Sequence, residues 1–270
     1  MASLSADALS SFDRVSLYNS PFPAHDEGRA IDCYARSHAP SPVAGTVVET
    51  RATRAPSRPH AAAADHLVVV DTGDHLARLL HVRPTVAPGD AVAVGDPLGP
   101  LVPSGYLAPW VGTHVHVGFR PSDGDPVRAS GSLPLELDVP VRAAPWDGVG
   151  RVVERAPTYV DLAGPPHPAP GTLAGVASDG GAALDGGFPH YDGGGAFGGG
   201  AGAVSLFGAR VGERSGRTVR WDEAVTVRAN GTPVTGLSLS LSRTGPLRVR
   251  VVCPGDWTAP VGETVRLSVG

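Results

Sequence analysis

The chain has 270 residues, a formal net charge of −4 at pH 7 and 41% hydrophobic residues, with 36 glycines and 27 prolines. It contains no lysine, which excludes a Walker-type phosphate loop and a pyridoxal Schiff base, and its weakly acidic balance argues against nucleic acid as a partner. No apolar run approaches the roughly 18 residues of a membrane span, and Met1 to Arg14 lacks the basic and apolar regions of a secretory signal, so we expect a cytoplasmic protein without a membrane partner.

Short valine- and leucine-rich runs flanked by glycine, proline or aspartate dominate the first part of the chain. Such runs predict β-strands, because branched side chains suit a pleated surface and the flanking residues suit turns. The sequence Asp71-Thr72-Gly73-Asp74, between two of these runs, predicts a hairpin. The predicted strands cover residues 46–50, 67–71, 75–82, 91–94, 114–119, 149–154 and 158–162.

The stretch 164–171 reads GPPHPAPG, and its prolines exclude regular structure and predict a stiff connector. A glycine-rich stretch follows over 193–202, and Asn230-Gly231 predicts a second hairpin. Further strands are predicted over 218–221, 224–229, 236–242, 247–252 and 264–269. We therefore expect a mainly β protein, with an antiparallel β-sheet domain over 1–163 and a smaller, glycine-rich β domain of unknown role over 171–270.

Two histidines one residue apart, His114 and His116, lie in the predicted strand 114–119. Side chains two positions apart on a strand point to the same face, so the two imidazoles would be presented together. Such a pair can supply one metal ligand and, beside it, one acid–base group. The spacing alone makes the two histidines equivalent.

A second pair, His25 and Asp32, is separated by seven positions. On a straight helix this spacing corresponds to about 10 Å of rise, which is too long for two ligands of one ion. A loop turned by Gly28 into a strand carrying Asp32 would bring the two side chains together. With one histidine of the His114/His116 pair they would supply three protein ligands and leave a fourth position open, as in catalytic zinc sites.

Residues Tyr18 to Pro121 resemble the lysostaphin/LytM-type zinc metallopeptidases. The first motif, H-x-x-G-x-A-x-D from His25 to Asp32, departs from the H-x-x-x-D spacing of that family and is similar to the first motif of D-alanyl-D-alanine carboxypeptidases. The other resembling segments are Ala30-Ile31-Asp32, SPVAGTVVE over 41–49, Leu80-His81-Val82, VAPGDAVAVGDPLG over 86–99 and Thr113-His114-Val115-His116.

The resemblance implies a metallopeptidase-like β domain over 1–163 with Zn²⁺ held by His25, Asp32 and His116. It also implies that His81 and His114 are the catalytic histidines, and that the protein is an enzyme that hydrolyses peptide bonds of a peptide or peptidoglycan-like substrate with metal-activated water. Because all five residues precede Pro121, we expect the first domain to hold the site and the C-terminal domain to bind, orient or shield the substrate.

Two other functions remain open from the sequence. One is a non-catalytic, metallopeptidase-like binding or adaptor protein, and the other is a histidine phosphoryl carrier. A lipoyl or biotinyl carrier is excluded, because it needs a modified lysine and the chain has none. The zinc content of the purified protein would discriminate between the remaining possibilities. The sequence does not indicate an oligomeric state.

Overall fold

The computed structural model of the protein describes residues 1–36, 38–255 and 257–270. These residues form two compact units, one made of Met1–Val15 and Arg29–Val139 and the other of Ser16–Gly28 and Pro140–Gly270. Both are built almost entirely from β-strands, as expected, and the one helix among the described residues is the four-residue α1 (Pro23–Asp26). No helix in this part of the chain has the length and apolar character needed to cross a bilayer.

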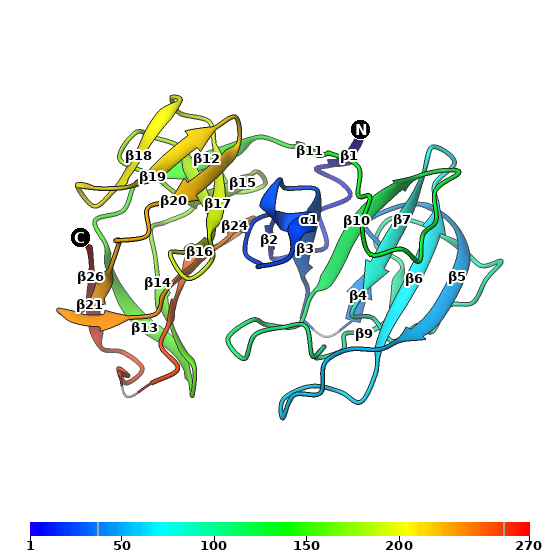
Figure 1. Cartoon of the computed structure of the whole chain (residues 1–270), viewed down its shortest axis with the longest axis horizontal. Helices are drawn as coiled ribbons and strands as arrows, with labels where there is room; N and C mark the ends of the chain where they lie inside the picture. Colours follow the sequence, from blue (N-terminus) through cyan, green and yellow to red (C-terminus); the bar gives the residue numbers. More distant parts are fainter. Residues whose placement is uncertain (37, 256) are drawn as a thin grey trace. The chain divides into compact units, whose positions relative to one another are not determined.

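An antiparallel sheet organises the first unit (Figure 1). The hairpin predicted at Asp71–Asp74 is confirmed, because the two strands that flank it pair with Leu67 opposite Leu80, and Gly73 adopts a φ of 90° in the turn. Val68 and its two successors are fully buried, so both faces of their strand are covered. Neighbours across the sheet are β3 (Ala30–Tyr34), β10 (Val115–Pro121), β7 (His75–Leu80), β6 (Asp65–Asp71), β5 (Gly45–Thr53) and β8 (Ala91–Val92).

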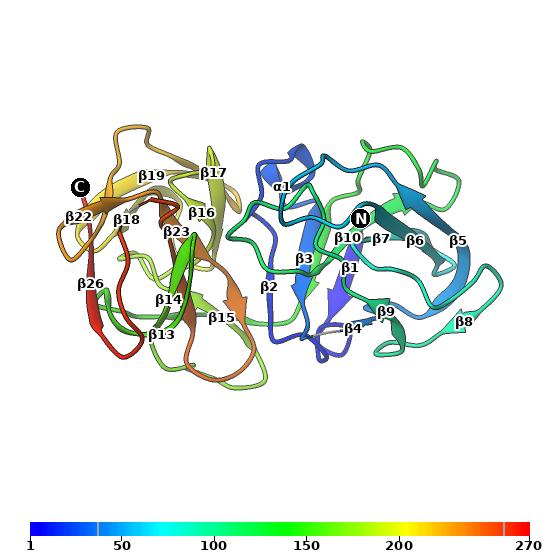
Figure 2. The same ribbon diagram turned by 90° about the horizontal axis from the view of Figure 1, so that it is seen from below.

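Two short strand pairs complete the first unit. The N-terminal strand β1 (Ala2–Ser5) runs parallel to β11 (Leu135–Asp138). The strand β4 (His38–Pro40) pairs antiparallel with β9 (Pro97–Pro100), and Figure 2 shows these two strands side by side. The strand β2 (Arg14–Ser16) lies where the chain leaves this unit.

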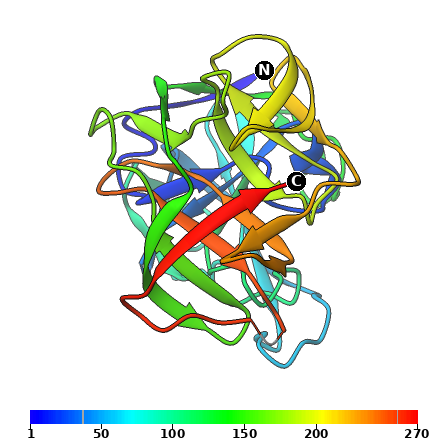
Figure 3. The same ribbon diagram turned by 90° about the vertical axis from the view of Figure 1, so that its left-hand side faces the viewer.

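The second unit contains a twelve-stranded sheet and three strands outside it: β12 (Val141–Ala144) runs parallel to β15 (Leu173–Val176), which pairs antiparallel with β24 (Leu241–Ser242). Its core includes Phe188 and Trp221, which pack edge to face with ring centroids 5.0 Å apart. In Figure 3 the C-terminal strand, drawn in red, runs between its two partners β13 and β21. The order across the sheet is β18 (Gly202–Leu206), β19 (Ala209–Ser215), β20 (Thr218–Trp221), β17 (Gly193–Phe197), β16 (Ala183–Phe188), β23 (Gly236–Leu239), β25 (Arg248–Val252), β14 (Tyr159–Ala163), β13 (Val149–Ala156), β26 (Thr264–Val269), β21 (Val227–Ala229) and β22 (Thr232–Val234).

The division between the units differs from the one expected at the proline-rich stretch 164–171. The chain passes into the second unit at Pro140, and the prolines separate β14 from β15 within that unit. They interrupt regular strand pairing because proline has no backbone N–H to donate. As a result the second unit is the longer of the two rather than the smaller, and it also takes in Ser16–Gly28 from near the N-terminus.

The glycine-rich stretch 193–202 contains a strand that the sequence does not predict. Gly193–Phe197 forms β17, paired with β16 on one side and β20 on the other. Glycine is required here because neighbouring rings occupy the space of a side chain: a Cβ at Gly194 would overlap Trp221, and one at Gly195 would overlap Tyr18. The glycines of this strand therefore serve close packing rather than chain flexibility.

Candidate metal centre and catalytic residues

Asp32 and His116 lie directly opposite each other on the paired strands β3 and β10. Cross-strand partners present their side chains on the same face, which brings Nδ1 of His116 to 3.0 Å from Oδ1 of Asp32, where it donates a hydrogen bond. Asp32 is buried, while 16% of the His116 side chain remains exposed. The strand pairing thus places a carboxylate and an imidazole together at a point that solvent can reach.

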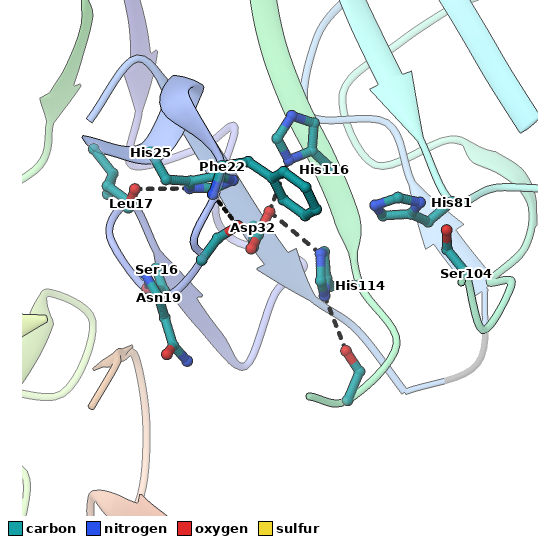
Figure 4. Close-up of polar contacts among 12 residues, drawn as sticks. Ser16, Leu17, Asn19, Phe22, His25, Asp32, His81, Ser104, His114 and His116 are labelled. Carbon is teal, nitrogen blue, oxygen red and sulfur yellow. Dashed lines mark hydrogen bonds and ion pairs between the residues drawn. The ribbon is translucent and has the colours of Figure 1, made fainter. Parts of the chain in front are cut away.

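His114 precedes β10 by one residue and joins the same cluster (Figure 4). Its Nδ1 donates to the carbonyl oxygen of Gly112 at 2.9 Å, so the neutral ring keeps its lone pair on Nε2, which lies 3.3 Å from Oδ1 of Asp32. When Nε2 is protonated, this approach becomes an ion pair between His114 and Asp32. Burial lowers the pKa of His114, but the charge of Asp32, its contact with the ring and the hydrogen bond to Gly112 together hold this pKa above its ordinary value.

His81 follows β7 and is oriented by a buried carboxylate. The strand predicted over 75–82 ends at Leu80, because His81 has a φ of 69°, in the left-handed region that an extended strand cannot include. Its Nδ1 donates to Oδ2 of Asp65 at 2.7 Å, and Ser104 Oγ donates to the same oxygen at 2.7 Å. The His81 ring centroid lies 5.3 Å from that of His114 and 6.0 Å from that of His116.

Asp65 is held in its ionised form by these donors. Burial raises the pKa of Asp65, but the hydrogen bonds from His81, from Ser104 and from the backbone N–H of His66 together bring this pKa below its ordinary value. A carboxylate that accepts Nδ1–H fixes the tautomer of a histidine and stabilises its imidazolium form. The Asp65–His81 pair therefore leaves Nε2 of His81 able to accept a proton.

His25 is almost fully buried on α1, where the sequence suggests a loop. Its Nδ1 donates to the carbonyl oxygen of Leu17 at 2.8 Å, which leaves the lone pair on Nε2 (Figure 4). Gly28, two residues after the helix, has a φ of 60° and redirects the chain towards β3, as its place in the sequence suggests. His25, Asp32 and His116, called the ligand group below, have one potential ligand atom each within 4.8 Å of one another.

The chemistry of the ligand group fits zinc. Two imidazoles and one carboxylate are borderline ligands that zinc accepts, and three protein ligands leave one position for water or substrate. Zinc bonds of about 2.0–2.1 Å in a tetrahedral site place ligand atoms about 3.3 Å apart, so a modest contraction would bring the group onto one ion. The backbone acceptor of His25 is the kind of outer partner that ligating histidines have.

Two residues of this cluster, Asp65 and Ser104, are not predicted from the sequence. A signal for Asp65 was present: the predicted hairpin at 71–74 pairs the start of one strand with the end of the next, and His81 N–H indeed donates to the carbonyl oxygen of His66 at 3.2 Å. Extending the hairpin by that register places His66 opposite His81 and Asp65 one position further along the strand, so the register indicates that Asp65 lies near His81 but not that their side chains meet. Ser104 comes from a loop, and no periodic pattern indicates its position.

Three solved structures show some likeness to this chain. A mutant catalytic domain of the prophage-encoded M23 protein EnpA from Enterococcus faecalis matches at 25% identity and a TM-score of 0.31, over 46% of this chain and 88% of that one. LytU matches at 22% identity and a TM-score of 0.26, over 38% and 68%. The catalytic domain of the antimicrobial peptidase lysostaphin from Staphylococcus simulans matches at 19% identity and a TM-score of 0.32, over 47% and 92%. TM-scores this low carry no inference about function.

No curated protein matches the chain. Two family models do match it: the N-terminal domain described as domain of unknown function DUF8155 covers residues 3–137, and the DUF8155 C-terminal domain covers residues 142–270. The break between the two models falls where the chain passes into the second unit at Pro140. The first model alone matches half of the chain and the second most of the remainder, so this protein belongs to the DUF8155 family.

Proposed function

We propose that the protein is a zinc-dependent hydrolase that cleaves peptide (amide) bonds. The observation that carries this proposal is one cluster in which two histidines and Asp32 could hold a metal ion, beside two further histidines whose Nδ1–H groups are already fixed by acceptors. A structural histidine needs one satisfied polar contact, whereas four histidines oriented in this way suit an acid–base site.

His25, Asp32 and His116 would hold the zinc ion. When bound, zinc would polarise the scissile carbonyl and lower the pKa of a water molecule. The chain's own residues then move the protons. Nε2 of His81 takes a proton from the attacking water, and Asp65 stabilises the imidazolium that results. Nε2 of His114, when protonated, donates to the oxygen on which negative charge develops.

The substrate we propose is a peptide or peptidoglycan-like chain. Support comes from the first motif, His25 to Asp32, whose spacing is similar to that of D-alanyl-D-alanine carboxypeptidases. Short peptides that end in D-alanyl-D-alanine are therefore the first substrates to test, beside isolated peptidoglycan. A phosphoryl carrier is less well supported, because it must present a histidine to a partner protein, and His81 and His114 are only 6% and 1% exposed.

Metal binding and hydrolysis test the proposal together. The chelator-treated protein is reconstituted with Zn²⁺, and bound zinc and peptide hydrolysis are measured for the wild type, Asp32→Ala and His116→Ala. We expect about one zinc per wild-type chain, with loss of both zinc and hydrolysis in the two variants. His60→Ala, at an exposed histidine that bonds to Leu107, is the matched control and should keep both properties.

Two results would contradict the proposal. Absence of zinc from the wild type under excess Zn²⁺, or equal zinc in all variants, would show that the ligand group is not a metal site. Zinc bound by the wild type but lost from the variants, with no hydrolysis of any peptide or of peptidoglycan, would refute the hydrolase and support the adaptor protein instead.

A further inference from the structure

The segment Ser16–Gly28, which carries His25, is held inside the second unit by a buried carboxylate. Asp185, on β16, is fully buried. Its Oδ1 accepts a hydrogen bond from Ser16 Oγ at 2.5 Å, and its Oδ2 accepts one from the backbone N–H of Leu17 at 2.7 Å. A buried carboxylate is costly unless donors satisfy it, so these two bonds bind the segment firmly to β16.

Leu17 links this carboxylate to the ligand group. Its N–H donates to Asp185, and its carbonyl oxygen accepts the Nδ1–H of His25 at 2.8 Å. The position of the Leu17 backbone therefore determines both the orientation of the His25 ring and its tautomer. The nitrogen left with a lone pair is Nε2.

The two residues after Leu17 are fixed to the same unit. The Tyr18 ring lies against Gly195 on β17, where a Cβ would overlap it, and its hydroxyl accepts a hydrogen bond from Arg217 Nε at 3.2 Å. The Asn19 side-chain amide donates to Ser238 Oγ on β23. Leu17, Tyr18 and Asn19 are thus each anchored to a different part of the second unit. The glycines of β17 leave room for the Tyr18 ring.

We propose that Asp185 is a positioning residue for His25, acting through Leu17, and that β16 and β17 are therefore needed for tight zinc binding. The inference rests on the proposed function in one respect, namely that His25 binds zinc. It gives Asp185 a role in orienting one proposed metal ligand within the second unit.

The test is the Zn²⁺ dissociation constant of the full-length protein, measured by competition with a chromophoric chelator at neutral pH. Asp185→Asn retains one acceptor oxygen, so Ser16 or Leu17 loses its partner, and we expect zinc to bind about 10–100-fold more weakly. Asp161→Asn is the matched control. Asp161 is an equally buried carboxylate of the same sheet, bonded to Arg250, and zinc affinity should not change.

A double-mutant cycle distinguishes positioning from general loosening. If Asp185 acts through His25, then Asp185→Asn should weaken zinc binding no further in a His25→Cys background, where a ligand is kept but there is no imidazole for Leu17 to orient. An additional loss of similar size in that background would overturn the proposal, and so would a single Asp185→Asn variant with wild-type zinc affinity. A wild type that binds no zinc would overturn the proposed function itself.

If Asp185→Asn does not fold, a second variant tests the same positioning role. Gly195→Ala introduces a methyl group that must displace the Tyr18 ring, and it should also weaken zinc binding. Gly200→Ala is its control, because a Cβ there would meet no atom within 4 Å. Equal zinc affinity in the two glycine variants, with both folded, would overturn the positioning role of this unit.

Discussion

Replacing Asp65 with asparagine tests whether His81 transfers a proton. Oδ2 of Asp65 accepts hydrogen bonds from His81 and Ser104, and Oδ1 accepts one from His66 N–H. Asparagine has nearly the same shape but can place an NH₂ donor where Oδ2 accepts. The donor would favour the tautomer of His81 that carries its proton on Nε2, and Nε2 could then no longer accept one.

The expected loss is large for turnover and small for folding. A missing general base lowers turnover by about 10²–10⁴-fold, which corresponds to about 3–5 kcal/mol of activation free energy. The substituted amide would still bond to its three neighbours, so charged hydrogen bonds become neutral ones, and the free energy of unfolding should fall by about 1–3 kcal/mol. Zinc content should stay at the wild-type level, because neither Asp65 nor His81 belongs to the ligand group.

Turnover on the best peptide of the panel, zinc content and urea unfolding are measured on the same preparations. Ser104→Ala is the control, since it removes one donor to Asp65 and leaves the bond between Asp65 and His81 intact. It should lose much less activity than Asp65→Asn. Wild-type turnover in a zinc-loaded Asp65→Asn variant would refute a role for His81 in proton transfer.

Three further predictions concern the same cluster. His116→Ala should lose zinc and activity together, whereas His114→Ala should keep zinc and lose about 10²–10⁴-fold in turnover; the opposite pattern, measured by zinc stoichiometry beside kinetics, would reverse their roles. Zinc affinity should fall as pH drops through the imidazole range near about 6.5, because binding displaces protons from the ligands, and chelator competition at several pH values checks this. Asp65 has a lowered pKa in the folded protein, so its contribution to stability should be complete above about pH 3.9 and disappear as the pH falls through that lowered pKa. Urea unfolding of the wild type and Asp65→Asn should accordingly show a stability difference that shrinks in acid, and a constant difference would contradict it.

Local patterns predicted much of the first unit. The hairpin at 71–74 and the strands around it follow from alternation and turn residues, which depend on neighbours in the chain. The placement of Asp32 opposite His116 needs only that both segments be strands, and the shared face then brings the two side chains together. Their assignment as zinc ligands came from family resemblance and stays a prediction.

Contacts distant in the chain were beyond sequence reasoning. Asp185 reaches Leu17 across 168 positions, and no periodicity joins β16 to a segment near the N-terminus. The left-handed backbone conformation of His81 could not be predicted either, because the preference of histidine for that conformation is too weak. The expected division at 164–171 assumed that a proline-rich stretch separates two domains, whereas this stretch lies within the second unit.

The excursion of Ser16–Gly28 into the second unit has a consequence for folding during synthesis. Chains emerge from the ribosome with the N-terminus first. Residues Met1–Val139 are therefore complete while β16 and β17, the partners of the excursion, have yet to be made. During that interval Leu17 has no carboxylate to hold its backbone. The histidine of α1 can take up its final orientation only after these later strands have formed, so the proposed metal site can be completed only once β16 and β17 have been synthesised.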